Sequence, residues 1–429
     1  MAWFSRKEAA TPQHTKSAGF LIGPGAGRFL GHGANYRLLA TEGYTQNCVA
    51  FAAINRIATA CSSVEPQLYK KTGAKLDKIE SHELLTLMES PNAAQSGKEF
   101  LQTLVSHRLT GGNAFVLGTG IDHRGGQTVK ELCLLSPDHV EVKPGAHLFP
   151  EKYVYKPNAL TFDYPVDPLT GRSAVLHLKT FNPLNPWVGL SPLLAAAYGI
   201  DIHNAGQQWN KRLLENDARP SGALIVKGAD GSPAELNDEQ FRRTKAEIDQ
   251  QYSGSSNAGR PMLLEGGLEW KEMSLTAKDM DFLEAKNSAA NDIGLTLGVP
   301  PQLLGIPGAQ TFANYEQANL SFWTDTVIPL LSVILEGFNR WLTPLYGDDL
   351  YLWFDENAID ALEPLRKLKA ERVHANTSWS VNEKRRATGQ ADVDGGEVVL
   401  VSSASIPLDL AGGMDLPEPG SPADTGTDE

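Results

Sequence analysis

The sequence of 429 residues predicts an α+β fold. Two observations carry this prediction. In several long segments apolar residues recur every three or four positions, which is the spacing of one face of a helix. Between these segments lie clusters of short apolar runs separated by Pro, Gly and Asp, a pattern typical of short strands. The length favours two to three domains.

Residues 1–45 lack sustained periodicity and are interpreted as a flexible N-terminal arm. Their apolar run at 19–22 is too short for the core of a signal peptide, so we expect synthesis in the cytoplasm. The Gly-rich stretch at 23–33 follows no strand and opens no helix, which favours a flexible segment over a phosphate-binding loop. The chain offers no run of about 18 uninterrupted apolar residues, so we expect no membrane span.

Residues 46–190 are predicted to form a mixed α+β unit. Its first helix buries a stripe of residues spaced by three and four, namely Ala50, Ala53, Ile54, Ile57, Ala58 and Cys61. Its second helix opens at Ser96, which can form a capping box with Glu99. The predicted strands are 64–71, 113–121, 132–137, 140–144, 153–157 and 174–179.

Residues 191–297 are predicted to hold two long helices around a smaller α/β insertion. The first helix runs for about 25 residues within 191–217. The insertion, 218–276, contains strands at 221–226 and 261–266 and an exposed helix that Asn237 can cap. The second helix, within 277–297, ends at Gly298 and two prolines.

A Gly/Pro-rich loop is predicted at 298–313, followed by the longest helix and a strand within 314–354. Pro329 lies inside that helix and should bend it near Asp325, because proline lacks a backbone donor and clashes with the preceding turn. Residues 355–400 are interpreted as small helices with polar faces. Residues 401–429 hold six acidic residues and no Lys or Arg, and are predicted to be a disordered acidic tail.

Charge and cysteine content exclude several classes of protein. The formal net charge is −13, and −7 remains without the tail, which argues against a protein that grips nucleic acid by its phosphates. The three cysteines are widely spaced, so neither a disulfide framework nor a zinc site is expected. Cys48 and Cys61 lie on or near the first helical stripe and are interpreted as buried free thiols.

The sequence carries no recognisable catalytic motif. It lacks a P-loop, an HExxH pair and a GxSxG elbow, and the histidines have no ligand spacing. Carboxylate pairs occur at Asp348-Asp349, Asp355-Glu356 and Asp392/Asp394, and a metal-dependent phosphoesterase using them is the least favoured alternative. We therefore expect an architectural protein that is not an enzyme and needs no cofactor.

Seven segments of the chain, in this order, carry a resemblance to a known family. They are CVAFAAINRIATACSSVEPQLYKK, HELLTLMESPNAAQSGKEFLQTLVSHRLTGGNAFVLG, GLSPLLAAAYGIDI, NDARPSGALIV, AKNSAANDIGLTLGVPPQLLGI, TFANYEQANLSFWTDTVIPLL and WSVNEKRRATGQADVDGGEVVL. Together they resemble the HK97-like portal proteins of tailed bacteriophages. The resemblance covers about residues 46–400, and the arm and the tail lie outside it.

The resemblance implies a portal-type fold. It assigns 46–190 to a mixed α/β wing, 191–217 and 277–297 to a two-helix stem, and 218–276 to a small α/β clip. It assigns 298–313 to a tunnel loop, 314–354 to a long kinked wing helix with its following strand, and 355–400 to a helical crown. Small residues of the first stem helix, such as Ala195 and Gly199, allow close packing either between subunits or within the chain.

The resemblance also implies partners and a location. The protein would form a homododecameric ring at the portal vertex of the virion, after synthesis in the host cytoplasm. Double-stranded DNA would pass through the ring during packaging and ejection. Further partners would be the terminase large subunit, a head–tail adaptor protein, and the major capsid protein or scaffold. A structural head–tail or capsid component without a DNA channel is the main alternative.

The resemblance directs attention to a few residues of the loop and the clip. DNA contacts would come from polar or uncharged tunnel-loop residues, namely Gln302, Gln310, Thr311, Phe312 and Asn314. Position and charge suggest that the clip meets the terminase or adaptor through Arg219, Lys227, Glu265 and Lys271. A mildly acidic protein suits a conduit, because a basic lining would hold the phosphates of the moving duplex.

Overall fold

The computed structural model describes residues 35–73, 75–119, 129–146, 149–215, 222–227, 239–240, 242–243, 246, 268–272, 282–307 and 312–399. The chain divides into two compact units, residues 1–355 and 356–429. Each unit is described below by itself.

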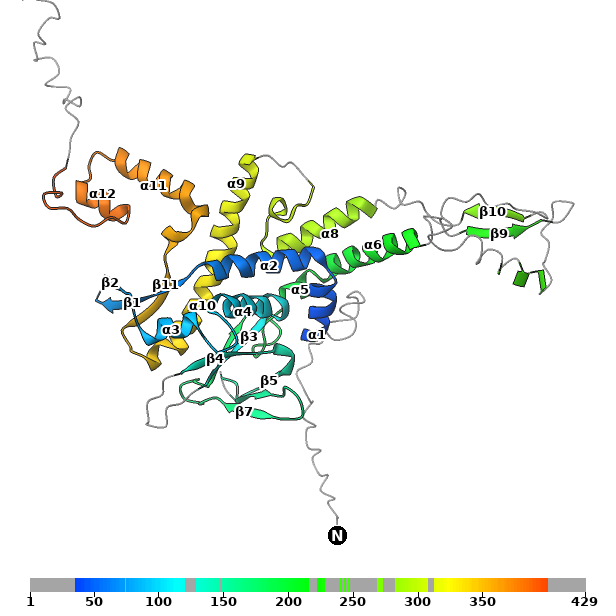
Figure 1. Cartoon of the computed structure of the whole chain (residues 1–429), viewed down its shortest axis with the longest axis horizontal. Helices are drawn as coiled ribbons and strands as arrows, with labels where there is room; N and C mark the ends of the chain where they lie inside the picture. Colours follow the sequence, from blue (N-terminus) through cyan, green and yellow to red (C-terminus); the bar gives the residue numbers. More distant parts are fainter. Residues whose placement is uncertain are drawn as a thin grey trace, which may run out of the picture. The chain divides into compact units, whose positions relative to one another are not determined.

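The first unit combines helices with small antiparallel sheets (Figure 1). Its helices are α1 (Tyr36–Leu38), α2 (Cys48–Ser63), α3 (Glu83–Glu89), α4 (Gly97–Gly111), α5 (Pro192–Ala195), α6 (Ala197–Glu215), α8 (Phe282–Leu297), α9 (Phe312–Ser321) and α10 (Ile328–Trp341). Its 3₁₀ turns are η2 (Pro137–His139), η4 (Pro301–Leu304) and η6 (Thr343–Leu345), and its π-helical segments are η1 (Leu39–Thr45) and η5 (Phe322–Val327). The mixture of helices and sheets is the predicted α+β class.

Within the described residues the strands form four separate antiparallel sheets, in the order β11-β1-β2, β4-β3-β8, β5-β6-β7 and β10-β9. Their bounds are β1 (Pro66–Thr72), β2 (Lys75–Ile79), β3 (Asn113–Thr119), β4 (Glu131–Leu135), β5 (Val140–Lys143), β6 (Lys152–Tyr155), β7 (Phe162–Pro165), β8 (Val175–Lys179), β9 (Gly222–Val226), β10 (Leu268–Glu272) and β11 (Leu350–Phe354). In the first sheet Leu68 pairs with Leu352, so two strands far apart in the sequence meet in the core of this unit.

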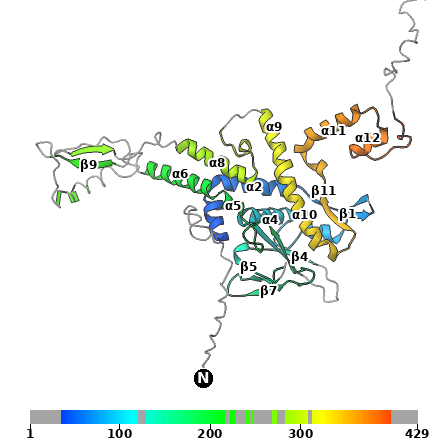
Figure 2. The same ribbon diagram turned by 180° about the vertical axis from the view of Figure 1, so that it is seen from behind.

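Helix α2 lies at the centre of the packing and contacts α4, α8 and α10 (Figures 1 and 2). The six residues of its predicted stripe are all fully buried. Burying an isoleucine such as Ile54 or Ile57 stabilises the fold by about 1.5–3 kcal/mol. Asn47 caps the helix by accepting from the backbone N–H groups of Val49 and Ala50.

Helix α4 begins and ends as its sequence dictates. Ser96 and Glu99 form the predicted capping box. At the other end Gly112 adopts φ 73°, and a Cβ there would lie 2.5 Å from the carbonyl carbon of Leu190. Only glycine fits this close approach in a left-handed conformation. The Gly112 carbonyl accepts from Thr180 N–H at 2.9 Å, which ties α4 to the segment after β8.

Three expectations about the first unit are wrong. The predicted 25-residue helix from Pro192 is divided at Ala196, whose ψ of 5° departs from helical geometry. Cys48 is exposed because it opens α2 two residues before Ala50 and so lies off the stripe, whereas Cys61 is buried as expected. Three edge strands, β2, β7 and β10, had not been predicted, since charged and polar residues hide their alternation. The predicted strand 261–266 and the cap Asn237 lie outside the described residues.

The long helix appears as three consecutive segments, α9, η5 and α10, over Phe312–Trp341. Among the described residues, Ala313–Leu345 is the one helix long and apolar enough to cross a bilayer by length and composition. Its apolar residues Leu331, Ile334 and Phe338 are buried inside the protein. They therefore contribute to the core of a folded domain.

The second unit is described up to residue 399 and is helical. It contains η7 (Glu356–Ala358), η8 (Asp360–Leu362), α11 (Glu363–Ala375) and α12 (Val381–Ala387). A second capping box, between Ser380 and Glu383, opens α12. The helices are short and largely exposed, which agrees with the predicted polar faces. The acidic tail 401–429 lies outside the described residues.

Candidate functional site

The candidate site is the segment that joins α8 to α9, with the elements that hold it. The chain leaves α8 through Gly298, which adopts φ 72°. Thr326 Oγ1, in the π-helical segment η5, donates to the Gly298 carbonyl at 2.6 Å. A Cβ on Gly298 would lie 2.7 Å from the same hydroxyl oxygen. The hydrogen bond and the glycine together fix the start of the loop against the long helix.

Arg56 of α2 contacts the segment between α8 and α9 on both sides, at η4 and at α9. Its Nη1 donates to the Leu303 carbonyl in η4 at 3.0 Å, and its Nη2 donates to the Tyr315 hydroxyl of α9 at 3.4 Å. Its guanidinium also lies 5.8 Å from the centre of the Phe322 ring. One side chain therefore connects α2 to both sides of the loop and to η5.

Buried apolar side chains also hold the segment between α8 and α9 against the protein. Val299, Leu303 and Ile306 are each less than a tenth exposed, although they belong to a segment predicted to be a loop throughout. The turn η4 occupies Pro301–Leu304, and Gly305 ends it with φ 71°. The first half of the predicted tunnel loop is thus an ordered turn packed on the protein.

The structure separates the predicted tunnel-loop residues. Gln302 lies in η4 and is partly buried, whereas Asn314 lies in α9 and is exposed. Phe312 opens α9, and its side chain lies outside the described part. Gln310 and Thr311 also lie outside the described residues. In the described segments 298–307 and 312–323, Glu316 is the one charged residue, so no cation there can hold a phosphate.

The predicted kink site contains a π-helical turn. Pro329 is the second residue of α10 and cannot donate to the carbonyl of Asp325. In the turn before it, Ile328 N–H donates to the Trp323 carbonyl, a spacing of five residues. Hydrogen bonds from the Ser321 and Thr324 hydroxyls lower the pKa of Asp325, so that its carboxylate stays ionised. The π turn shows that the long helix is irregular at this point, whereas the bend of the helix axis near Asp325 stays a prediction.

Helices α6 and α8, the predicted stem, lie side by side in both views (Figures 1 and 2). A Cβ on Gly199 would lie 3.2 Å from the Ala289 carbonyl, so this small residue allows close packing within the chain. A buried polar cluster joins α6 to the start of α2. There Asn47 Nδ2 donates to Asn204 Oδ1 at 2.9 Å, and Asn204 Nδ2 donates to the Glu42 carbonyl at 3.0 Å.

The outward face of α6 is apolar. Tyr198 and Ile202 are 55% and 51% exposed, and Ala205 is exposed one turn further on. Leu295 of the neighbouring α8 is 80% exposed. The spacing of i, i+4 and i+7 places the three α6 residues in one stripe. We call Tyr198, Ile202 and Ala205 the α6 stripe; this spacing could have been found from the sequence.

The predicted clip is described through the hairpin of β9 and β10. Lys227 and Glu269 form an ion pair across it. Lys271 lies in β10 opposite Ala223, and its side chain is outside the described part. Arg219 and Glu265 fall outside the described residues. Of the four predicted clip residues, the structure therefore shows an ion pair for Lys227. Whether Lys227 contacts the terminase or the adaptor stays a prediction.

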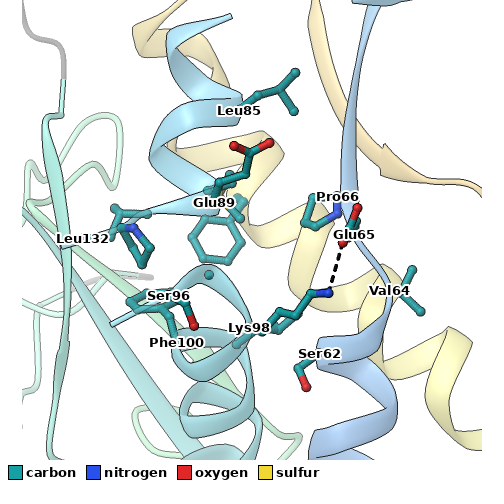
Figure 3. A pocket seen from close by; sticks show the side chains of 15 residues that line it. Ser62, Val64, Glu65, Pro66, Leu85, Glu89, Ser96, Lys98, Phe100 and Leu132 are labelled. Carbon is teal, nitrogen blue, oxygen red and sulfur yellow. Dashed lines mark ion pairs between the residues drawn. The ribbon is translucent and has the colours of Figure 1, made fainter. Parts of the chain in front are cut away.

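The described residues hold no constellation suited to catalysis. They contain no group of three or more His, Cys, Asp or Glu that could hold a metal. Asp349 pairs with Lys70 at 3.2 Å and Asp392 with Arg386 at 2.8 Å, so these carboxylates form surface ion pairs. A cavity of about 300 Å³ beside α3 and α4 is lined mainly by apolar residues such as Leu85 and Phe100 (Figure 3).

This cavity carries one charged pair, Glu65 with Lys98 at 3.0 Å, and both side chains are mostly exposed (Figure 3). Its remaining charged residue is Glu89, and the lining has no cysteine or histidine. Ser62 and Ser96 supply hydroxyls, but no basic residue of the lining contacts either one; Ser62 donates to the Thr59 carbonyl and Ser96 to Glu99. The lining has no nucleophile paired with a base.

Comparison with known proteins gives one consistent family. A family model described as phage portal protein matches residues 48–389. A protein from Rickettsia bellii, named as uncharacterized, is 40% identical over 83% of this chain and 90% of its own length. The portal protein of Enterobacteria phage HK97 is 25% identical over 75% of this chain and 73% of its own length.

Solved structures agree with this result. A chain from the neck of an empty GTA particle is 37% identical with a TM-score of 0.66, covering 86% of this chain and 97% of that one. A chain from the neck of a native GTA particle computed with C12 symmetry is 36% identical with a TM-score of 0.64, covering 83% and 94%. An HK97 family phage portal protein from Corynebacterium diphtheriae, at 15% identity and a TM-score of 0.51 over 76% and 96%, shares the fold.

Proposed function

Because the chain belongs to the family of HK97-like phage portal proteins, we propose that it forms a closed homododecameric ring at one vertex of a virion or gene-transfer particle. Double-stranded DNA passes through the centre of this ring during packaging and ejection. The family is structural, and the described residues form no catalytic site. The C12 symmetry named for one similar neck structure supports twelve subunits.

The observation that carries the ring proposal is the exposed α6 stripe. A cyclic ring uses heterologous contacts, in which one face of a subunit meets a different face of the next. The α6 stripe of Tyr198, Ile202 and Ala205 presents apolar side chains to solvent, and Leu295 of the neighbouring α8 is 80% exposed. Contact with the stem helices of a second copy removes this surface from water, at about 25 cal/mol per Å² of apolar area.

The joint of loop and long helix supports the channel proposal. Arg56 and Thr326 fix the base of the loop, while the first residues of α9 remain exposed. Exposed residues that are held in place by such contacts can line a channel and keep their position while the DNA moves past them. Since Glu316 is the one charge in the described segments, these residues meet the duplex sterically and do not hold its phosphates.

The remaining partners are assigned by position along the chain. The hairpin of β9 and β10, between the two stem helices, is proposed as the contact for the terminase large subunit and later for the head–tail adaptor protein. The unit of small sheets within 46–190 is proposed to meet the major capsid protein or scaffold. The polar pair Lys227–Glu269 suits a surface that exchanges partners, because exposed ion pairs contribute little to stability.

Imaging with matched variants tests the ring. Purified wild-type protein should give rings with a central hole in negative-stain class averages. Ile202→Asp places a charge in the α6 stripe and should shift the population to monomers. Leu169→Asp makes the same change at an 89% exposed site between β7 and β8, outside the stem helices, and should keep the rings. Monomers alone, solid discs, or equal behaviour of the two variants would contradict the proposal.

A loop deletion tests the channel separately. Ile306 is only 8% exposed, so the deletion should spare it and remove residues 308–311 alone. Rings should still form, and particles built from them should retain less DNA. Normal DNA retention with intact rings would contradict the role of the loop, whereas failure to form rings would make the loop part of the assembly interface.

A further inference from the structure

A second, larger cavity lies away from the proposed channel edge. It has a volume of about 780 Å³ and is bordered by residues of α4, β8, α10 and the segment that leads into β11. All of these elements belong to the first unit. The cavity is open to solvent on one side, and its lining differs from that of the apolar cavity in Figure 3 because it carries several cations.

The central observation is the state of Arg108 in α4. Its side chain lines the cavity, and the residue is only 8% exposed. Its Nε and Nη1 atoms are buried and make no hydrogen bond within the part of the chain that the structure describes. An unpaired buried charge costs several kcal/mol, so a guanidinium in this position requires an anionic or polar partner.

Among the residues that the structure describes, no neighbouring group supplies that partner. Cys61 of α2 interacts electrostatically with Arg108, but burial raises the pKa of its thiol to about 12, so it stays neutral. Burial lowers the pKa of Arg108, but a guanidinium keeps its charge at neutral pH. No ion pair in the described residues joins Arg108 to a carboxylate.

The other charges of the cavity are also predominantly positive. Arg340, Lys71 and Lys179 line it, against two carboxylates, Glu336 and Asp348. One of the two carboxylates is already engaged, because Glu336 Oε1 accepts from the Tyr351 hydroxyl at 2.5 Å.

Both lysines of the lining are held in place by other contacts. Lys71 Nζ lies 4.1 Å from the centre of the Tyr351 ring, and Lys179 Nζ donates to the Pro186 carbonyl. His177, which also lines the cavity, stays neutral because burial lowers its pKa to about 3. The cavity therefore presents an excess of fixed positive charge beside apolar walls such as Leu178 and Pro344.

We propose that this cavity is a binding site for a phosphate group, with the buried Arg108 in its lining and Arg340 and Lys71 as further cations. A planar guanidinium binds the oxygens of a phosphate through two parallel N–H donors, and a site with several cations favours a dianion over a single carboxylate. The group can come from inorganic phosphate or from a small phosphate monoester, whose organic part would lie on the apolar walls.

Titration of the full-length protein with inorganic phosphate tests the site, at constant ionic strength maintained with chloride. Saturable binding is expected by calorimetry, together with a saturable rise in Tm. Arg340→Gln and Lys71→Gln should each weaken the affinity roughly tenfold, because each removes one charge-assisted contact. Glycerol 3-phosphate, titrated in parallel, distinguishes the two sources: tighter binding than inorganic phosphate identifies the monoester.

Neighbouring residues of β1 provide a matched control. Lys70 precedes Lys71, pairs with Asp349 and does not line the cavity, so Lys70→Gln should bind phosphate like the wild type. Arg108→Met keeps most of the side-chain volume and should abolish binding; if it does not fold, Arg340→Gln and Lys71→Gln still decide. The proposal is overturned if phosphate has no effect beyond that of chloride, or if Lys70→Gln and Lys71→Gln bind alike.

Discussion

The two ends of the long helix, α9 and α10, make the most informative comparison in the molecule. In α10 the residues Leu331, Ile334 and Phe338 are at most 1% exposed. In α9, by contrast, residues 313–317 are all exposed and Ala318 is the first buried position. A single run of helix is therefore anchored in the core at one end and uncovered at the other. We infer that the uncovered end is built for contact with something outside the protomer.

The segment between α9 and α10 explains how one helix can be buried in the core at one end and exposed at the other. The π turn η5 separates them, and Thr326, Arg56 and Phe322 tie that turn to Gly298 and α2. We therefore expect a force on α9 to be transmitted through these contacts to α2 and the core. Four predictions test this difference, beginning with the largest expected effect.

Removing a buried ring from α10 should cost far more than removing an exposed one from α9. Phe338→Ala should lower the free energy of unfolding by about 3–5 kcal/mol, because it loses a fully buried ring and leaves a cavity. Tyr315→Ala should cost about 1 kcal/mol or less, since the ring is 46% exposed. Denaturant titration of both variants measures the difference, and equal losses would contradict the comparison.

Acid should weaken the anchored region through His177, whose strand β8 packs against α10. Burial lowers the pKa of His177 to about 3, whereas the unfolded chain has the ordinary value of 6.5. The stabilising contribution is present above pH 6.5 and is lost as the pH falls toward 3, because the unfolded chain takes up the proton first. The free energy of unfolding should therefore fall by up to about 1.4 kcal/mol for each pH unit.

His177→Gln should remove this pH dependence while keeping a donor for Asn113 Oδ1, which lies 2.9 Å from His177 Nε2. Unfolding measured by denaturant between pH 4 and pH 7, in roughly half-unit steps, compares the variant with the wild type. Parallel pH profiles for the two proteins would mean that His177 is not the group responsible.

Thr326→Val should loosen the joint without disturbing either end. The change removes the hydrogen bond to the Gly298 carbonyl and keeps the shape of the side chain, so we expect a loss of about 1 kcal/mol. Hydrogen exchange should rise at 298–307 and stay unchanged in α10. Ser332→Ala, which removes a hydroxyl bond within α10, is the control. Faster exchange throughout the helix would show that the joint does not act locally.

Pro329→Ala should have the smallest effect on stability, within about 1 kcal/mol, since the residue is exposed. The new N–H can donate to the Asp325 carbonyl, so the π turn should convert to regular α-helix. A structure of the variant checks this change. Persistence of the π turn would mean that its cause lies in the contacts of η5 and not in the proline.

Local patterns of the sequence predicted much of the fold. The α2 stripe and the Ser96 capping box involve residues a few positions apart, so their spacing alone determines the outcome. The edge strand β2 was missed because its residues Lys75–Ile79 carry three charges and show little apolar alternation. The pairing of β1 with β11 also has no local signal.

The candidate site was less predictable, for a physical reason. Arg56 reaches a carbonyl 247 residues further along the chain, and Thr326 one 28 residues before it. Hydrogen bonds of this kind follow from tertiary packing and leave no periodic pattern. An arginine beside the buried stripe of α2 was the available hint, since such a residue needs a partner. Arg108 is a similar case, because it lies among the buried residues of α4.

The most direct test is a cryo-EM reconstruction of the purified ring. We expect a closed ring in which residues 312–317 of α9 border the central hole, the α6 stripe lies between neighbouring subunits, and α10 is buried within each subunit. A ring whose hole is bordered by other elements, with the start of α9 on the outer surface, would contradict the proposed channel.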